Sequence, residues 1–373
     1  MKVSVLQENL TEALHISSRF VSNKAQLPVL SNILISADKN KLLISATNLE
    51  LSISLNVGAK VEEDGGITVP SRFITDLIGN LPSGTISLQA EKEQLKIERE
   101  NFNSTLAGMN TSDFPSIPAT LDKDSASLPG KEFIDALAQV LFAVSTDETR
   151  PVLTGVLLIF KEKEVVLVST DGFRLSQKKL PFPSEKKVFA EQKLILPKSA
   201  LTELSRLGGE SEKIEFSFSK EESRIIFGID SIVLTSRTIG GEFPDFEKII
   251  PKTSSIKINL DKEEFLRGVK LASVFARESA NVTKLNIGGD FVEIEAESSK
   301  SGSQKNRVDS KVEGDVEKGL TIAFNYRFLE EFLGVVSGED VEIELGDSNS
   351  PGIFKDPKDK DFLHLIMPVR LTS

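Results

Sequence analysis

The chain of 373 residues contains no cysteine, and this absence excludes several kinds of site. Without a thiol the protein can form no disulfide, use no thiolate nucleophile and bind no metal through a thiolate. Its only histidines are His15 and His364, so a zinc or copper site would need Asp and Glu for most of its ligands. No such cluster is visible in the sequence, which therefore predicts neither a metal nor another cofactor.

Long hydrophobic runs are also missing. No uninterrupted apolar stretch reaches the roughly 18 residues that a membrane-spanning helix needs. The N-terminal stretch MKVSVLQENLTEAL lacks the apolar core of a signal peptide. We therefore expect a cytoplasmic protein with no membrane partner.

The motifs of common enzymes are absent as well. We find no G-x-x-x-x-G-K-[ST] phosphate loop, no G-x-S-x-G elbow, no H-E-x-x-H and no dinucleotide-binding fingerprint after a strand. Acidic residues gather at 62–64 and 356–361, in polar, turn-like sequence, and a solvated loop explains the first group better than an acid–base site. His15 is expected on the polar face of a helix and His364 within a C-terminal strand. The sequence predicts no catalytic residue.

The composition is that of a soluble globular protein, with 39% hydrophobic and 27% charged residues. The length suits two or three domains. The formal net charge is −11, which argues against a protein that coats nucleic acid electrostatically.

One unit is repeated three times along the chain. Apolar residues at helical spacing recur in three short segments, each of which predicts an amphipathic helix packed on a sheet: Leu10–Leu14, Phe133–Leu137 and Phe265–Val269. A β-hairpin is predicted after each helix, with turns at Asp38–Asn40, Lys161–Glu164 and Gly288–Asp290. The hairpin of the second copy begins at Pro151, and Asp171-Gly172 is expected to form a turn after it.

A second helix recurs in each copy. It begins at Pro70, at Pro197 and near Phe324, and it ends near Gly79, Gly208 and either Gly334 or Gly338. Alternating strands follow, such as Thr85–Ala90 with Gln94–Arg99. These patterns predict an α+β fold of three tandem copies, each with two helices packed on antiparallel sheet, over residues 1–120, 128–250 and 251–373.

Several segments carry a family resemblance from one end of the chain to the other: Leu27–Leu34, Ala46–Glu50, Val69–Phe73, Asp113–Pro115, Ser169–Leu175, Gly241–Phe246 and Met367–Leu371. With these segments the chain resembles the bacterial DNA polymerase III β subunit, the replication sliding clamp. The resemblance implies a DNA-clamp fold in which two chains form a head-to-tail homodimeric ring around double-stranded DNA. Such a ring is a processivity factor for DNA replication and catalyses nothing.

The resemblance also implies partners. The ring would tether the replicative polymerase, and it would bind the clamp loader, repair polymerases and other clamp-motif proteins through a peptide pocket. It answers the objection from charge, because a topological link to DNA needs no net affinity for phosphate. The residues that the resemblance assigns to the pocket are Leu153, Thr170, Gly172, Phe173, Arg174, Leu175, Pro244, Ile249, Leu365 and Met367.

Two further sets of residues follow from the resemblance. Candidates for DNA contact are Lys24, Arg72, Arg150, Lys198 and Arg206. Candidates for the dimer interface are Leu106, Val274 and Phe275. Acidic residues are at least as numerous as basic ones in the predicted helices, so the sequence itself predicts no basic lining.

Alternatives remain open at this point. Leu153, Leu175 and Leu365 could be ordinary strand core, and Val274 and Phe275 could be helix core. The whole chain could instead be an enzyme with an unrecognised carboxylate site, or a structural repeat protein.

Overall fold

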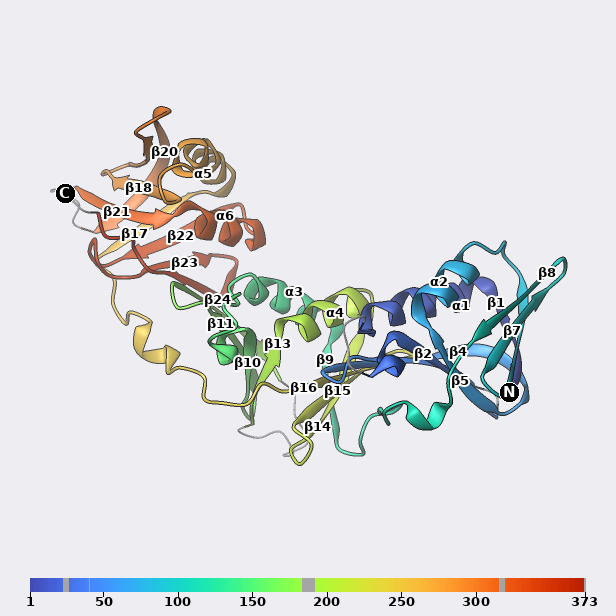
Figure 1. Cartoon of the computed structure of the whole chain (residues 1–373). Coiled ribbons are helices and arrows are strands. Elements are labelled where there is room, and N and C mark those ends of the chain that lie inside the picture. Colours follow the sequence, from blue (N-terminus) through green and yellow to red (C-terminus); the bar gives the residue numbers. More distant parts are fainter. Residues whose placement is uncertain (23–26, 40, 183–191, 315–318, 372–373) are drawn as a thin grey trace. The chain divides into compact units, whose positions relative to one another are not determined.

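A computed structural model describes residues 1–22, 27–39, 41–182, 192–314 and 319–371, and it divides into two compact units (Figure 1). The first unit contains residues 1–131 and 206–238. The second contains residues 132–205 and 239–373. The middle third of the chain is therefore shared between the units.

The first unit is built on a 12-stranded antiparallel sheet. Its strands run in the order β8-β7-β6-β1-β4-β16-β15-β14-β9, and β2, β3 and β5 join it beside β4. Their bounds are β1 Lys2–Leu6, β2 Asn32–Asp38, β3 Lys41–Thr47, β4 Leu51–Glu63, β5 Gly65–Pro70, β6 Thr85–Glu91, β7 Gln94–Arg99, β8 Phe102–Ala107, β9 Ser125–Pro129, β14 Lys213–Ser219, β15 Arg224–Ile229 and β16 Ile232–Arg237.

Helices α1 (Gln7–Ser17) and α2 (Ser71–Gly79) pack on each other, and both contact this sheet. In α1 the residues Leu10, Ala13 and Leu14 are buried, at the spacing that places one helix face against a sheet. Pro70 ends β5 immediately before α2, where its missing N–H costs no hydrogen bond.

The second unit has its own 12-stranded antiparallel sheet, in the order β13-β10-β11-β12-β24-β23-β22-β17-β20-β19-β18-β21. The bounds are β10 Gly155–Phe160, β11 Glu164–Thr170, β12 Arg174–Pro181, β13 Lys193–Pro197, β17 Ile256–Asp261, β18 Val282–Ile287, β19 Phe291–Ser298, β20 Gly302–Gly314, β21 Leu320–Asn325, β22 Asp340–Leu345, β23 Gly352–Asp356 and β24 Asp359–Ile366.

The remaining helices are α3 (Gly130–Leu141), α4 (Lys198–Gly208), α5 (Lys262–Ala276) and α6 (Tyr326–Val335). Side chains cap two of them: Asp261 accepts a hydrogen bond from the backbone N–H of Glu264 at 2.8 Å, and Asn325 accepts one from Arg327 at 3.0 Å. The largest core of this unit contains Phe332, whose ring packs against those of Phe354 and Phe362.

The predicted repeat is confirmed at the level of elements. A pair of helices recurs in each third of the chain, and the second copy's hairpin turns between Phe160 and Glu164 as expected. The hairpin's start is corrected: Pro151–Leu153 is a 3₁₀ turn, as is Pro28–Ser31, and the strand begins only at Gly155. Proline fixes φ and cannot donate to a ladder, so it favours a turn at this position.

No helix in the described part of the chain is long and apolar enough to cross a membrane.

Among the glycines of the described structure, Gly130 at the start of α3 leaves the least room for a Cβ atom. A Cβ added there would lie 1.9 Å from the carbonyl oxygen of Ser211. We expect Gly130→Ala to destabilise the fold by about 1–3 kcal/mol, because the strand end must shift to admit the methyl group. Calorimetric unfolding measures the loss.

Gly240→Ala is the matched control, because a Cβ there meets no atom within 4 Å. Equal melting temperatures for the two variants would contradict the packing argument.

Candidate functional site

A hydrogen-bonded turn precedes β12, in the segment Thr170–Arg174 of the second unit. The Thr170 hydroxyl accepts the Gly172 N–H at 3.0 Å, and one carboxylate oxygen of Asp171 accepts the N–H groups of Phe173 and Arg174 at 2.9 and 3.0 Å. Gly172 has φ +92°, a conformation that glycine adopts without strain. The turn directs Phe173 outward, where its side chain is 63% exposed.

The structure brings the end of β24 to this turn. The backbone N–H of Met367 donates to the carbonyl oxygen of Phe173 at 2.9 Å, and Met367 is exposed. Exposed Pro244 and Ile249 lie on the linker that ends in the 3₁₀ turn Phe246–Ile249. These four side chains are the accessible members of the predicted pocket.

The other predicted pocket residues lie beneath them. Leu175 and Leu365 face each other across the β12–β24 pairing and have no exposed surface. They share a hydrophobic cluster with Phe246. Leu153 and Thr170 are also buried. Leu175 and Leu365 are therefore strand core, whereas Leu153 is buried in the 3₁₀ turn Pro151–Leu153.

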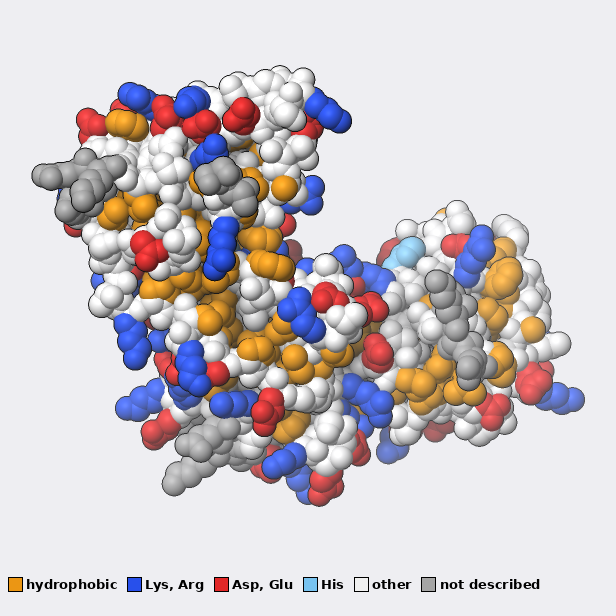
Figure 2. All heavy atoms as spheres, turned by 60° about the vertical axis from the view of Figure 1, so that its left-hand side comes forward, with side chains coloured by type: hydrophobic (Ala, Val, Ile, Leu, Met, Phe, Trp, Pro, Cys, Tyr) orange, Lys and Arg blue, Asp and Glu red, His pale blue; other side chains and the backbone are white. Residues whose placement is uncertain are grey.

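A groove of about 600 Å³ lies beside Pro244. Apolar side chains line it, including Leu157, Ile195 and Phe243, and Lys193 and Glu242 also face it. Figure 2 shows apolar side chains gathered on the surface of the unit that carries the C-terminus, with charges of both signs around them. The linker thus crosses a surface that is suited to apolar side chains of a ligand.

Arg174 is buried, with only 7% of its surface exposed, and it connects several segments of the second unit. Its guanidinium forms ion pairs with Asp171 and with Glu331 of α6, and it donates to the carbonyl oxygen of Phe142 at 2.6 Å. The rings of Phe328 and Phe142 lie 4.4 and 5.4 Å from the guanidinium carbon. A buried charge with this many partners is stabilising only while all of them are in place.

His364 is buried near Arg174. Its ring stacks on Phe332 at 5.5 Å, and its Nδ1 lies 2.7 Å from the Ser176 hydroxyl. Burial, with the nearby positive charge of Arg174, holds the pKa of His364 well below its usual value. The histidine is therefore neutral in the folded state, and its Nε2 has no hydrogen-bond partner among the described residues.

We call the antiparallel pairing that joins one repeat to the next a joint, and the two joints in the chain share one design. In the first, β4 pairs with β16, with Leu51 opposite Ser236. In the second, β12 pairs with β24, with Arg174 opposite Ile366. The same hydroxyl-capped turn precedes both β4 and β12.

A shorter turn with a hydroxyl cap precedes β20. The Ser298 hydroxyl accepts the N–H groups of Lys300 and Ser301 at 3.3 and 3.2 Å. Ser298 pairs with Gly302, whereas Thr47 pairs with Ser52 and Thr170 with Leu175, so this turn is one residue shorter than the other two. Among the described strands, the first half of β20 pairs only with β19, and β8 pairs only with β7. Strand β8 and the first half of β20 are therefore two of the edges that have no neighbour on one side among the described strands.

The predicted interface residues lie beside these edges. Val274 of α5 is 60% exposed, whereas Phe275 is partly buried and packs against the core. Leu106 is on the edge strand β8 and is partly exposed. The interpretation as helix core therefore fits Phe275 in part and does not fit Val274.

The predicted DNA-contact residues lie on several different elements and differ in exposure. Arg72 is on α2 with its side chain 90% exposed, and Arg206 is exposed on α4. Arg150 pairs with Asp147 at 3.1 Å, and Lys198 is half-buried at the start of α4. Lys24 lies outside the described residues. Acidic residues slightly outnumber basic ones in the described helices, as the sequence indicates.

The acidic groups singled out in the sequence are held in ion pairs and turns. Glu62 pairs with Lys2, and the Asp64 carboxylate accepts the N–H of Lys39. Asp356 is buried and binds the N–H groups of Ser337 and Gly338, which fixes a loop. No group of three or more His, Asp or Glu residues in the described ranges is placed to hold a metal.

Comparison with known proteins agrees with this architecture along the whole chain. Models of the N-terminal, central and C-terminal domains of the DNA polymerase III beta subunit match residues 1–118, 127–245 and 247–370. The chain belongs to the DNA polymerase III beta subunit family.

Relatives along the full length of the chain are named sliding clamps. The beta sliding clamp of Staphylococcus aureus is 30% identical over 99% of both chains. The structure of the DNA polymerase sliding clamp from Bacillus subtilis is 25% identical with a TM-score of 0.94, and that from Pseudomonas aeruginosa is 26% identical with a TM-score of 0.90; each covers 100% of both chains. The predicted family, the three tandem clamp domains and the role as a non-catalytic processivity subunit are thereby confirmed.

Sequence reasoning missed the partners of Arg174 and the neighbours of His364. The fold brings these side chains together from distant segments, so no local spacing reveals them. A signal did exist for the repeated joint: Thr47–Leu51 aligns with Thr170–Arg174, and both segments begin with the threonine that caps the turn.

The low pKa of His364 predicts an acid-sensitive fold. The unfolded chain binds a proton at the ordinary histidine pKa and the folded chain does not, so stability is complete above about pH 6.5 and falls by about 1.4 kcal/mol per pH unit below it. The loss ends when the pH reaches the lower pKa of the folded state. His364→Phe should reduce this loss, as measured by urea unfolding at pH 7.5 and pH 5.5.

His15→Gln is the matched control, since that side chain is exposed on α1 and the acid dependence should stay as in the parent protein. An unchanged acid dependence in His364→Phe would show that other groups dominate it.

Proposed function

We propose that two copies of this chain join head to tail into a ring that encircles double-stranded DNA and tethers the replicative polymerase. The proposed domains are residues 1–120, 128–250 and 251–373. The observation that carries the proposal is the pair of unpartnered edges: the half of β20 that begins at Gly302, and β8.

The argument for closure follows from repetition. The chain uses one joint twice, so a third joint of the same design is the natural partner for these two edges, because unpaired strand edges favour association. It would place β8 of one copy against β20 of the other. Exposed Val274 would then be covered.

Weak attraction to DNA suits such a ring. A protein that neutralises many phosphates binds tightly and with strong dependence on salt, whereas a ring held by topology can slide. The candidates for contact are few, namely Lys24, Arg72, Arg150, Lys198 and Arg206, and the net charge is −11.

Tethering requires a site for partner segments, and the surface of Phe173, Pro244, Ile249 and Met367 supports one. Apolar side chains of an extended peptide can rest on it above the Leu175–Leu365 pair. Peptides of the polymerase, the clamp loader, repair polymerases and other clamp-motif proteins are the proposed ligands. A tethered polymerase stays at high effective concentration near its template. The cytoplasm is the proposed location.

Ring closure can be tested by negative-stain electron microscopy and native mass spectrometry of the purified protein. We expect two-chain rings with a central opening. Val274→Asp should weaken the dimer at least about a hundredfold, because each interface would bury an unpaired carboxylate. Ile249→Asp, which changes an exposed side chain outside the proposed joint, should leave the rings intact. Single-chain particles from the parent protein would overturn the proposal.

The pocket can be tested with the labelled peptide Gln-Leu-Asp-Leu-Phe and fluorescence anisotropy. Ile249→Asp and Met367→Asp should each weaken binding by about tenfold or more, since a carboxylate would face the apolar ligand. Here Val274→Asp serves as the control and should bind like the parent. Leu175→Asp is unsuitable, because a charge at that fully buried position would damage the fold itself. Equal binding by all four proteins would place the peptide elsewhere.

A further inference from the structure

The turn that supports the proposed peptide pocket has a second copy in the first unit. The Thr47 hydroxyl accepts the N–H of Leu49 at 3.0 Å, and the side-chain Oδ1 of Asn48 accepts those of Glu50 and Leu51 at 3.0 and 2.8 Å. These bonds repeat, position for position, the bonds of Thr170 and Asp171.

The two turns differ at the position that has a positive φ. Gly172 occupies the left-handed position of one turn, and Leu49 occupies the same position of the other with φ +75°. A branched side chain is strained in this conformation, and glycine would relieve the strain. The Leu49 side chain is nevertheless 48% exposed, so burial in the core does not compensate for the strain. Contact with a ligand is a reason to keep a leucine there.

A groove of about 480 Å³ opens beside this turn. One side is formed by Leu49 and by Pro115 and Ile117, and Pro115 corresponds in the repeat to Pro244 of the other pocket. Arg224 and Arg237 of β15 and β16 line it as well. The groove therefore has the same place on the first joint as the proposed peptide pocket has on the second joint.

The floors of the two sites are chemically different. At the second joint the facing pair is Leu175 and Leu365, and at the first joint it is Ser52 and Thr235. Thr235 is only 7% exposed, and its hydroxyl has no hydrogen-bond partner in the described structure. A leucine side chain would leave this hydroxyl unsatisfied, whereas a ligand oxygen would satisfy it.

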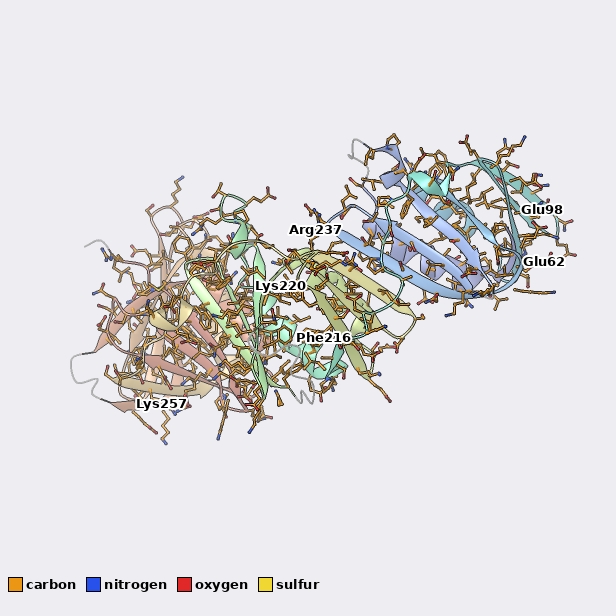
Figure 3. The ribbon with its side chains drawn as sticks, turned by 90° about the horizontal axis from the view of Figure 1, so that it is seen from below. Glu62, Glu98, Phe216, Lys220, Arg237 and Lys257 are labelled. Carbon is orange, nitrogen blue, oxygen red and sulfur yellow. The ribbon has the colours of Figure 1, made fainter. Side chains whose placement is uncertain are left out.

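Positive charge lies next to this floor. The Arg224 side chain is 28% exposed, and its Nε has no hydrogen-bond partner in the described residues, although another nitrogen of it pairs with Glu222. Arg237 lies at the end of β16, where its backbone N–H binds the carbonyl oxygen of Glu50 (Figure 3). Three acidic side chains, Glu50, Glu221 and Glu222, also line the groove; they are exposed, as Arg237 is, so water screens their charges.

We propose that this groove is a second peptide site, for an extended segment of a partner protein with one acidic residue flanked by apolar residues. The carboxylate binds Arg224, Arg237 and the Thr235 hydroxyl, while the flanking side chains contact Leu49 and Ile117. The exposed glutamates of the groove disfavour a second acidic residue. The groove stands on its own geometry, but the choice of a peptide as ligand rests on the proposed pocket at the second joint.

The probe is acetyl-Leu-Asp-Leu-amide, titrated into the intact protein with labelled Ile, Leu and Val methyl groups and followed by NMR. We expect saturable shifts at the methyl groups of Leu49 and Ile117. The isosteric acetyl-Leu-Asn-Leu-amide should bind about tenfold more weakly, because it loses the charge-assisted hydrogen bonds. Equal affinities for the two peptides, or no shift at Leu49 and Ile117 up to the solubility limit, would overturn the proposal.

Two variants separate a ligand role from a structural role. Arg237→Gln should weaken the Asp peptide severalfold, whereas Lys220→Gln, which removes a charge from the turn before β15, should not (Figure 3). Leu49→Gly should keep the melting temperature, because it relieves strain, and yet weaken the peptide. Retention of full binding by Arg237→Gln and Leu49→Gly would refute the assignment.

A parallel titration with Gln-Leu-Asp-Leu-Phe reports on the other pocket through the methyl groups of Ile249. Shifts at Ile249 without any effect of the Asp peptide at Leu49 would refute the second site and leave the proposed function standing. Shifts at Leu49 without any effect at Ile249 would support the second site and refute the proposed pocket at the second joint.

Discussion

The structure depends on one interaction: the pairing of a strand from one repeat with a strand from the next. Both 12-stranded sheets exist because a strand from one repeat pairs with a strand from the next, β4 with β16 and β12 with β24. Backbone N–H and C=O groups along an edge must be hydrogen-bonded by a neighbour or by water. A chain built of three such repeats uses this pairing twice, and the proposed head-to-tail association of identical chains would use it again at β8 and β20.

The two joints combine this common backbone with different side chains. At the second joint Arg174 is held by Asp171, Glu331 and two aromatic rings, next to the neutral, buried His364. The first joint has Leu51 in the place of Arg174. Pairing of strands sets the geometry of each joint, and the side chains then decide how firmly it holds and which ligand chemistry its surface accepts.

Sequence periodicity was sufficient for the helices, the hairpin turns and the threefold repeat, because these depend on residues close together in the chain. It failed at Pro151–Leu153, where the run of apolar residues suggested strand and the proline imposed a 3₁₀ turn. It also left open whether Leu175 and Leu365 are surface or core, since that depends on the linker carrying Phe246 over them. The grooves beside Pro244 and Leu49 join segments far apart in the chain, and no local pattern contains that information.

The division of the middle repeat between two sheets has a consequence for synthesis on the ribosome. Strand β4 cannot complete its ladder until β16 has emerged, since Leu51 pairs with Ser236. At ordinary translation rates that delay is on the order of ten seconds or more. During this interval the outer edge of β4, with Leu51, Ile53 and Leu55, stays open to other nascent chains. The first third of the protein therefore needs protection from co-translational aggregation that a self-contained domain would not need.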